Sequence, residues 1–399
     1  MFTAKQLDRY ADVLLWGLSK ARTKGFKKKD IILVRYDPAA VKLAEIIHNK
    51  LLAEGKNPVM RAGQTPGMEH SFYSLADDAQ LAFQAPGDRE LLKNLNGSIS
   101  LIAPESLTHL RDIDPKKIGR AAAARKPLRD LLDARENKGE FGWTLCMFPT
   151  QEMASHAGLS VEAYAKQIIR ACFLDRKDPV DQWMSVYKKA MTIKRWLNRM
   201  RINRLHVESR HTDIEINPGE SRKWLGISGH NIPSFELFLS PDWRNTRGTY
   251  FADMPSYRNG NYIKNLKIEF QKGEAATITA DEGQAFARKL LATDDGAPRI
   301  GEFSLTDKRF SKISRFMANT LFDENFGGRQ GNCHIALGAS YADTFAGDPA
   351  KLTKPLKRKL GFNDSAIHWD IINTEKKRVS AILPSGKKKT IYENGTFTL

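Results

Sequence analysis

The chain has 399 residues, 41% of them hydrophobic and 9% aromatic, which is enough apolar material for a packed core and favours two or more domains over one. No uncharged apolar run approaches membrane-spanning length and the start lacks a signal-peptide cleavage pattern, so we expect neither a transmembrane segment nor a signal peptide. The three cysteines are widely spaced and form no disulfide framework, which favours the reducing cytoplasm.

The chain is strongly basic. Lysine and arginine number 63 against 46 acidic residues, which gives a formal net charge of +17. Such a balance can attract nucleic acid or anionic surfaces. The basic clusters are short and scattered, and none is interleaved with aromatic residues that would stack on bases. A solvated basic surface is the simpler interpretation, while weak contact with nucleic acid or a preference for acidic substrates stays open.

The first half of the chain alternates helical and strand-like segments. Leu7, Tyr10, Leu14 and Leu18 recur at helical spacing and predict an amphipathic helix at the start. Further helices are expected at 39–52, 116–134, 160–173 and 180–200, and strands at 31–34, 57–60, 98–102 and 143–148. Strands that alternate with helices predict a mostly parallel, helix-covered sheet, so residues 1–200 are expected to form an α/β domain.

Strand-like runs dominate the second half. They are expected at 205–207, 212–216, 266–270, 275–279, 367–372 and 379–383, with one helix at about 282–291. Asn394 and Gly395 stand between two further strand-like runs and predict a tight C-terminal hairpin. Residues 201–399 are therefore expected to form an α+β domain with a large antiparallel or mixed sheet that carries the functional site.

The segment 321–341, LFDENFGGRQGNCHIALGASY, combines acidic residues, a histidine and a tyrosine around a glycine-rich stretch. Asp323, Glu324, His334 and Tyr341 are its polar members. Acidic side chains and histidines that converge are what a divalent metal site requires. Cys333 has no second cysteine nearby, so we interpret it as a small packed residue and not as a zinc ligand.

Further potential ligands occur elsewhere in the second half. His368 and Asp370 of IHWD are two residues apart, so a strand would project both from one face. Glu236 and Glu302 lie among apolar residues, where a carboxylate is costly to bury unless it is paired or bound to a metal. Each feature alone is equally compatible with an exposed strand face, and His334 alone with a structural histidine. Together they offer three carboxylates and two imidazoles, a set suited to a two-metal hydrolytic centre.

Four motifs in this order, NIPSFELFLSP, GEFSLTD, LFDEN…CHIALGASY and SAIHWD, resemble those of the thermophilic-type metalloaminopeptidases, the family of aminopeptidases T, II and S. The resemblance covers most of the chain and is most specific from Asn231 to Asp370. It implies a dinuclear metal-dependent aminopeptidase that removes N-terminal amino acids from short peptides by metal-activated water. It also implies two divalent ions (Zn, Co or Mn) per subunit, peptide substrates with a free N-terminus, no membrane association, and a homodimer.

The resemblance also assigns roles to single residues. The metal ligands that it implies are Glu236, Glu302, Glu324, His334, His368 and Asp370. Glu302 (or Glu324) would move a proton to the leaving amine, and Tyr341 would stabilise the tetrahedral oxyanion. Two departures from the family pattern stand out. Ser234 and Phe235 replace the usual Asp-Gly before Glu236, and the insert FGGRQGN (326–332) separates Glu324 from His334.

Two other functions are compatible with these residues. A basic protein with this fold could bind nucleic acid or another partner without peptidase activity, and salt-dependent retention on nucleic acid would favour that alternative. A similar metal centre could instead cleave non-peptide amides. A panel of aminoacyl amides with blocked-amine controls would separate amidase from aminopeptidase action.

Overall fold

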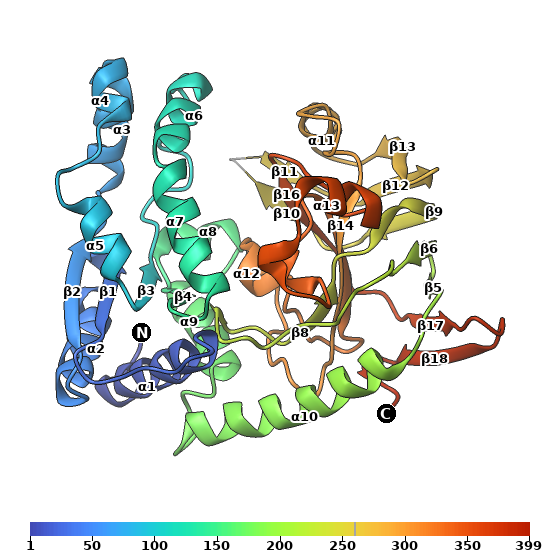
Figure 1. The fold of residues 1–399 in the computed structure, drawn as a ribbon, viewed down its shortest axis with the longest axis horizontal. Helices are drawn as coiled ribbons and strands as arrows, with labels where there is room; N and C mark the ends of the chain where they lie inside the picture. Colours follow the sequence, from blue (N-terminus) through green and yellow to red (C-terminus); the bar gives the residue numbers. More distant parts are fainter. Residues whose placement is uncertain (259–260) are drawn as a thin grey trace. The chain divides into compact units, whose positions relative to one another are not determined.

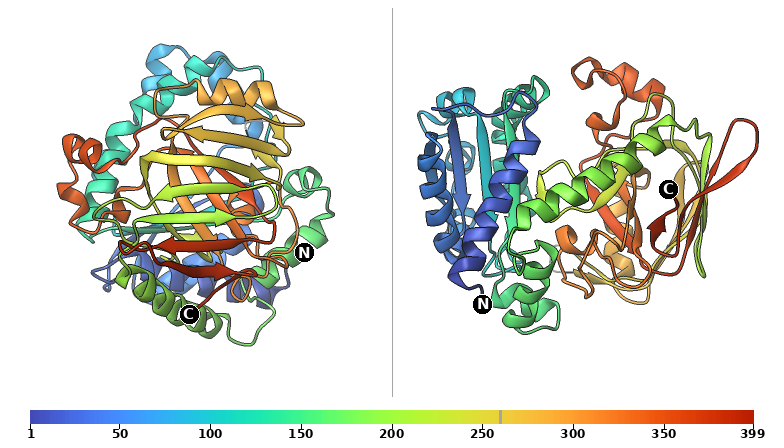
Figure 2. Two further views of the ribbon diagram at one scale, coloured as in Figure 1. Left: turned by 90° about the vertical axis from the view of Figure 1, so that its right-hand side faces the viewer. Right: turned by 90° about the horizontal axis from the view of Figure 1, so that it is seen from below.

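The computed structural model describes residues 1–258 and 261–399, which form two compact units (Figures 1 and 2). Unit 1 comprises Met1–Gln182 and Ser228–Ile232, and unit 2 comprises Trp183–Ile227 and Pro233–Leu399. The boundary between unit 1 and unit 2, after Gln182, lies within helix α10 (Pro179–Arg199). The domain limit at residue 200 stays a prediction.

Unit 1 is built on a five-stranded sheet whose strands all run parallel, in the order β2-β1-β3-β4-β7. The strands are β1 (Ile31–Tyr36), β2 (Asn57–Ala62), β3 (Gly97–Ile102), β4 (Gly142–Met147) and β7 (Asn231–Ile232). Leu33 of β1 packs with Leu92, Leu95 and Phe141, and leucines of α7 pack against this cluster. The predicted parallel, helix-covered sheet is thus confirmed.

The helices of unit 1 are α1 (Ala4–Ala21), α2 (Val41–Ala53), α3 (Pro66–Leu75), α4 (Asp78–Ala82), α5 (Asp88–Asn94), α6 (Pro115–Ala124), α7 (Lys126–Asn137), α8 (Gln151–His156) and α9 (Val161–Ala171), with a 3-10 turn η1 (Pro38–Ala40) before α2. Unit 1 thus has the helices predicted at the start of the chain, at 39–52 and at 160–173, and it also has α3, α4, α5 and α8, which were not predicted. None of the described helices has the length and apolar character needed to cross a membrane.

The single helix expected at 116–134 is wrong, because the structure has two helices there, α6 and α7. Pro127 lies in the first turn of α7. Inside a continuous helix this proline would lack an N–H donor and clash with the carbonyl four residues earlier. The chain therefore ends α6 at Ala124 and begins α7 at Lys126.

Unit 2 contains the large antiparallel sheet that was predicted, together with a second, smaller antiparallel sheet and a two-stranded ribbon that were not. The eight-stranded sheet has the order β13-β12-β9-β6-β5-β17-β18-β19, the four-stranded sheet the order β16-β15-β14-β8, and the ribbon pairs β10 with β11. The strands of the eight-stranded sheet are β5 (Arg204–Glu208), β6 (Asp213–Asn217), β9 (Asp242–Ala252), β12 (Leu266–Gln271), β13 (Glu274–Thr279), β17 (Arg378–Ile382), β18 (Lys388–Glu393) and β19 (Thr396–Phe397). The others are β8 (Glu236–Leu239), β14 (Ile300–Thr306), β15 (Asn332–Gly338), β16 (His368–Asn373), β10 (Ser256–Arg258) and β11 (Asn261–Ile263).

Short helices connect these strands. They are α11 (Gln284–Leu291), α12 (Thr320–Asp323), α13 (Lys354–Leu360), η2 (Ala342–Thr344) and η3 (Pro349–Lys351). The C-terminal hairpin predicted from Asn394-Gly395 is confirmed: β18 and β19 pair antiparallel, and the two turn residues have φ of 52° and 80°. Positive φ at both positions is what a two-residue type I′ turn requires.

The two sheets of unit 2 pack against each other. The Tyr250 hydroxyl of β9 donates to the carbonyls of Cys333 and Ile371, at 3.0 and 2.9 Å. The Tyr392 hydroxyl of β18 donates to the Thr306 carbonyl at 2.8 Å. One face of the four-stranded sheet is apolar, and its members Phe303, Leu305, Ile335, Leu337 and Ile371 are at most 1% exposed. The other face is left to carry polar residues.

Candidate metal centre

The four-stranded sheet gathers five of the predicted ligands. Each strand contributes at least one of them: Glu236 from β8, Glu302 from β14, His334 from β15, and His368 and Asp370 from β16. These predicted ligands therefore lie on the smaller sheet of unit 2 and not on its large eight-stranded sheet, where the site was expected.

The strand register places these residues on one face. His334 lies opposite Ser304, and Ala336 lies opposite both Glu302 and Asp370. Residues that are paired across strands, or two apart along a strand, share a face. The small side chains of Ser304 and Ala336 leave the space between the larger ligands open.

A β-bulge interrupts β14 directly before Glu302. Ile300 pairs with Leu337, but Glu302 pairs with Ala336, so Gly301 is an extra residue in β14. Glu302 shares the face of Ser304 by regular alternation, and the bulge places Ile300 on the opposite, apolar face with Leu337. The bulge also requires glycine, because a Cβ on Gly301 would lie 2.3 Å from the carbonyl oxygens of Gly338 and Ala339.

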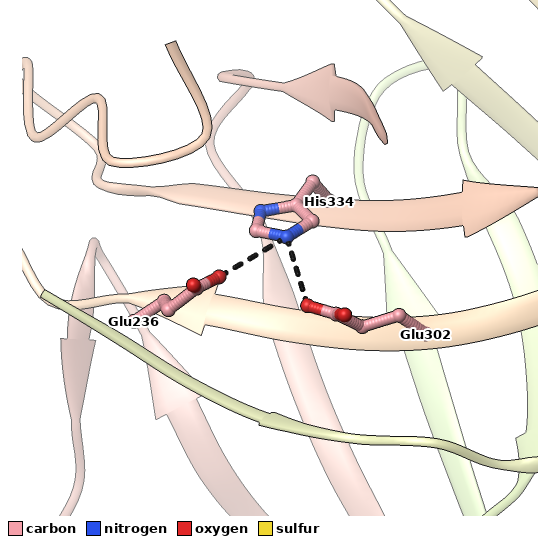
Figure 3. Close-up of side chains that lie close together, drawn as sticks. All are labelled: Glu236, Glu302 and His334. Carbon is pink, nitrogen blue, oxygen red and sulfur yellow. Dashed lines mark hydrogen bonds and ion pairs between the residues drawn. The ribbon is translucent and has the colours of Figure 1, made fainter. Parts of the chain in front are cut away.

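Glu236, Glu302 and His334 form a first group of converging side chains. Figure 3 shows both carboxylates pointing toward the imidazole of His334. The His334 Nε2 atom lies 3.2 Å from Oε2 of Glu236 and 3.3 Å from Oε1 of Glu302. All three residues are buried, and one ligating atom from each lies within 4.8 Å of the others.

Glu302, His368 and Asp370 form a second group with the same 4.8 Å limit. The His368 Nε2 atom lies 3.3 Å from Oδ1 of Asp370 and 3.6 Å from Oε2 of Glu302. Glu302 thus directs one carboxylate oxygen toward each histidine and belongs to both groups. This confirms that His368 and Asp370 project side by side from a strand, as predicted.

Protons balance the charges of this buried set. Burial raises the pKa of Glu302 to about 7, although the hydrogen bond from His334 opposes the shift. Burial would lower the pKa of His368, but the charge and hydrogen bond of Asp370 together with the charge of Glu302 outweigh it and raise that pKa to about 9. Burial would also raise the pKa of Asp370, but the charge and hydrogen bond of His368 together with the charges of His334 and Arg258 outweigh it and lower that pKa to about 2. A divalent cation would replace these protons as the counter-charge.

The surroundings of the set fit a metal site. His368 Nδ1 donates to the Ala339 carbonyl at 2.9 Å, so its Nε2 atom faces the carboxylates and is free to bind a metal once deprotonated. The Ser304 hydroxyl donates to Oε2 of Glu236 at 3.0 Å and orients that carboxylate. Carboxylate and imidazole donors suit Zn, Co and Mn. The residues present therefore fit divalent metal ions.

Glu324 lies beside the set but in neither group. It directly follows α12, and its carbonyl accepts from Thr306 Oγ1 at 3.2 Å and from Asn332 Nδ2 at 2.9 Å. The insert 326–332 therefore closes into a loop that ties Glu324 to β14 and β15. Burial, followed by the charges of Glu236 and Asp370, raises the pKa of Glu324 well above its usual range.

Asp323 has a structural environment. Its carboxylate accepts from the backbone N–H groups of Met317 at 2.7 Å and Asn319 at 2.9 Å. These bonds hold the segment that leads into α12. Asp323, although part of the segment singled out in the sequence, is absent from both ligand groups formed by the described residues.

Tyr341 lies at the edge of the set. Its ring centroid is 4.7 Å from that of His368 and 5.9 Å from that of Phe238. The residue is 45% exposed, yet burial of the hydroxyl and then the charges of Glu302 and Asp370 raise its pKa. The hydroxyl therefore lies within the electrostatic reach of the carboxylates while the ring borders solvent.

Two residues near the set were not predicted. Ser304 could have been found, because it lies two residues after Glu302 on a strand and so shares its face. Arg258 donates through Nη1 to the His368 carbonyl at 2.8 Å, and its charge helps to lower the pKa of Asp370. Its position comes from the ribbon β10-β11, and no local pattern indicated it.

The unusual Phe235 before Glu236 belongs to the core. It is fully buried, and its ring stacks on Trp183 with centroids 4.9 Å apart and planes at 7°. Its N–H donates to Asn325 Oδ1 at 2.5 Å. The side chain thus anchors the start of β8 next to Glu236.

A buried set of carboxylates and imidazoles on one sheet face fits a metal centre, and the comparisons with known proteins identify its class. Residues 3–397 match the family described as thermophilic metalloprotease (M29), so the chain belongs to this family. The predicted family and the predicted class, a metallopeptidase, are confirmed.

Individual relatives support the same assignment. Aminopeptidase PepS from Streptococcus thermophilus is 29% identical over 317 residues, which cover 75% of this chain and 73% of that protein. Aminopeptidase T from Thermus aquaticus is 29% identical over 311 residues, covering 73% and 74%. The structure of wild-type AmpT from Thermus thermophilus matches with a TM-score of 0.80 at 22% identity and covers 99% of both chains. These relatives give no support to a binding protein without peptidase activity.

Proposed function

We propose that the protein is an aminopeptidase with a dinuclear metal centre that removes N-terminal residues from short peptides. The observation that carries this proposal is the sharing of Glu302 between two ligand groups, with one oxygen toward each histidine. Glu236, Glu302 and His334 would hold one ion, and Glu302, His368 and Asp370 the other. Zn, Co and Mn all suit these donors.

Two divalent ions, when bound, supply Lewis acidity that polarises the peptide carbonyl and lowers the pKa of water. Both oxygens of Glu302 face histidines, so Glu324 is the carboxylate left to take up a proton and deliver it to the leaving amine. Tyr341 would donate its hydroxyl proton in a hydrogen bond to the carbonyl oxygen as negative charge develops there.

Metal analysis tests the centre directly. We expect about two divalent ions per chain in the purified protein, and loss of activity on aminoacyl amides after chelation, with recovery on adding Zn, Co or Mn. A content of one ion per chain would contradict the dinuclear assignment. Peptides with an acetylated amine should resist cleavage, and equal cleavage of blocked and free substrates would favour an amidase.

Replacing Tyr341 with phenylalanine tests the oxyanion role. We expect turnover to fall about 10²–10³-fold, since one hydrogen bond to the developing charge is lost. Metal content should stay normal, because Tyr341 is not a proposed ligand. Tyr262→Phe, at a tyrosine that is 37% exposed on β11, is the matched control and should leave turnover unchanged. Normal turnover in Tyr341→Phe would refute the role.

We further propose a cytoplasmic homodimer that acts on short peptides and excludes folded proteins. The support is the family relation together with three free, buried cysteines. Light scattering on the eluted protein should report twice the 45.0 kDa chain mass. Degradation of a folded protein as fast as a dipeptide would contradict the restricted access.

A further inference from the structure

Unit 2 contains a second polar site on its other sheet. Strands β5, β6 and β9 lie next to one another in this sheet (Figure 1). A cavity of about 610 Å³ opens beside them, where the β12–β13 turn approaches β9. We call it the bulge cavity and define it by Arg204, Arg244, Thr246, Arg247 and Lys272. Its volume suits a small molecule, but its lining is cationic and polar where most ligand pockets are apolar. The lining therefore favours an anion.

The cavity wall is formed by a large bulge in β9. Glu215 pairs with Arg247 and Asn217 with Asp242, so two steps along β6 correspond to five steps along β9. The extra residues leave the regular strand pairing, and Arg244, Asn245 and Thr246 among them line the cavity. Gly273, with φ of +88°, closes the bulge through its N–H to the Thr246 carbonyl at 3.0 Å. A regular sheet would offer no such wall.

Two guanidinium groups are held side by side by one carboxylate. Oε2 of Glu215 accepts from Arg204 Nη1 at 2.9 Å and from Arg247 Nε at 2.7 Å. Both carboxylate oxygens of Asp242 accept from Arg244: Oδ1 from Nε at 2.8 Å and Oδ2 from Nη2 at 2.5 Å. These bonds do not use Nη2 of Arg204 or Nη1 of Arg244 and Arg247. Donors in fixed orientations thus remain for a further anion.

The cationic charge of the cavity exceeds its acidic charge. Lys272 joins the three arginines, and Glu215 and Asp242 are the carboxylates that pair with them. Four cationic groups therefore stand against two carboxylates. The surplus attracts an anion with more than one charge.

Thr246 gives an independent indication of a ligand. The residue is fully buried in the cavity wall, and its Oγ1 has no hydrogen-bond partner among the described residues. A buried hydroxyl without a partner is unfavourable, so such groups call for an explanation. The hydroxyl has no accessible surface in the cavity wall, so a ligand oxygen would satisfy it after the side chain turns toward the bulge cavity.

We propose that the bulge cavity binds a small molecule that carries a phosphate group. Arginine forks and a hydroxyl match the several acceptor oxygens of a phosphate better than they match a single carbonyl. The volume leaves room for an organic group attached to the phosphate. The site lies on the eight-stranded sheet, so the inference does not depend on the proposed peptidase centre.

Calorimetric titration of the metal-loaded full chain tests the proposal. The probes are inorganic phosphate, adenosine 5′-monophosphate and adenosine at low ionic strength. We expect both phosphates to bind and adenosine not to bind. Tighter binding of the monophosphate would identify an organic phosphate as the ligand, and equal binding would identify free phosphate. Absence of binding by both phosphates would overturn the proposal.

Variants locate the binding. Arg247→Gln and Thr246→Val should each weaken phosphate binding about tenfold or more, since each removes a donor. Arg378→Gln is the matched control: Arg378 pairs with Glu393 as Arg247 pairs with Glu215, and their side chains are 57% and 62% exposed. It should leave binding unchanged.

Thr246→Val also separates binding from folding. Valine has nearly the same shape as threonine but lacks the unpartnered buried hydroxyl. The substitution should therefore keep or raise the Tm. Unchanged phosphate affinity in both cavity variants would overturn the proposal and place the anion at the metal centre. Equal weakening in Arg378→Gln would overturn it in favour of general surface charge.

Discussion

The parallel sheet of unit 1 and the four-stranded sheet of unit 2 use buried strand positions differently. In β1, Ile32, Leu33 and Val34 are fully buried, and all are hydrocarbon. In β14 and β15 every residue is buried as well, yet Glu302 and His334 are among them. Burial of apolar area stabilises the first sheet, whereas burial of unpaired charge opposes folding. The second sheet therefore gives up intrinsic stability to hold ligands.

Buried charge is distributed unevenly between the units. Among the described residues, the buried acidic and basic side chains are Arg22 in unit 1 and Glu236, Asp242, Glu302, Asp307, Asp323, Glu324, His334, Asp370 and Lys377 in unit 2. Ions that bind the folded state stabilise it by mass action. We infer that metal binding stabilises unit 2 and leaves the sheet of unit 1 unaffected, and the predictions below test this contrast.

The largest effect is expected for Glu302→Gln. Losing the shared ligand should remove several kcal/mol of transition-state stabilisation, so kcat/KM should fall about 10³-fold or more. Metal content should fall for both sites together, because Glu302 belongs to both groups. Kinetics and elemental analysis measure the two quantities.

Glu269→Gln serves as the control for Glu302→Gln, because Glu269 is a glutamate on β12 whose side chain is 44% exposed. It should change neither activity nor metal content. Retention of one full equivalent of metal in Glu302→Gln would show that the two sites do not share this carboxylate.

Leu33→Ala should lower stability without changing metal content, which is the opposite of the effect expected for Glu302→Gln. Leu33 is fully buried among Leu92, Leu95 and Phe141, so its truncation should lower the free energy of unfolding by about 2–5 kcal/mol. The folded variant should keep its metal content. Denaturant unfolding measures the loss, and Leu52→Ala, at a leucine 52% exposed on α2, should cost far less. Loss of metal from folded Leu33→Ala would break the contrast between the sheets.

Lys377 makes the stability of unit 2 depend on pH. Burial lowers its pKa to about 8, against about 10.4 in an unfolded chain. Between these values the unfolded state binds more protons, so stability rises with pH, by about 3 kcal/mol for this group alone. The cost of the buried charge is present in full below pH 8 and disappears as the pH approaches 10.4.

Lys377→Met should remove that rise when unfolding is compared at pH 7 and pH 10. Lys376→Met, at the exposed neighbouring lysine, should behave like the natural protein. If Lys377→Met kept the full rise, another group would be responsible.

The smallest effect is expected for Ser304→Ala. Its hydroxyl donates to Glu236 Oε2 at 3.0 Å, and loss of such an orienting contact typically weakens metal affinity 10–100-fold. Competition with a metal indicator measures the affinity. Ser380→Ala, at a buried serine on β17 of the eight-stranded sheet, should leave it unchanged. Equal affinity in both variants would leave Ser304 without an orienting role.

The sequence was sufficient for the elements that local pattern controls. The parallel sheet of unit 1, the C-terminal hairpin and the pairing of His368 with Asp370 on one strand face follow from alternation, turn residues and periodicity. The break between α6 and α7 could also have been predicted, because Pro127 was visible in the sequence.

Features that depend on pairing between distant strands were not predictable. The bulge at Gly301 places Ile300 on the face opposite to that of Glu302, and it becomes apparent only when the register with β15 is known. Arg258 reaches the His368 carbonyl from a ribbon more than one hundred residues away in the chain. The division of unit 2 into two sheets likewise results from long-range packing, such as that of Tyr250.

The strand β7 has a consequence for how the polypeptide could be cut or shuffled. Its residues, Asn231 and Ile232, complete the sheet of unit 1 but lie between two stretches of unit 2, four residues before Glu236. Neither unit is therefore encoded by one uninterrupted stretch of gene. A fragment that ends at Gln182 would leave the backbone of β4 without its outer neighbour, an open edge of the kind that promotes aggregation. Modular exchange between relatives would have to carry both units together.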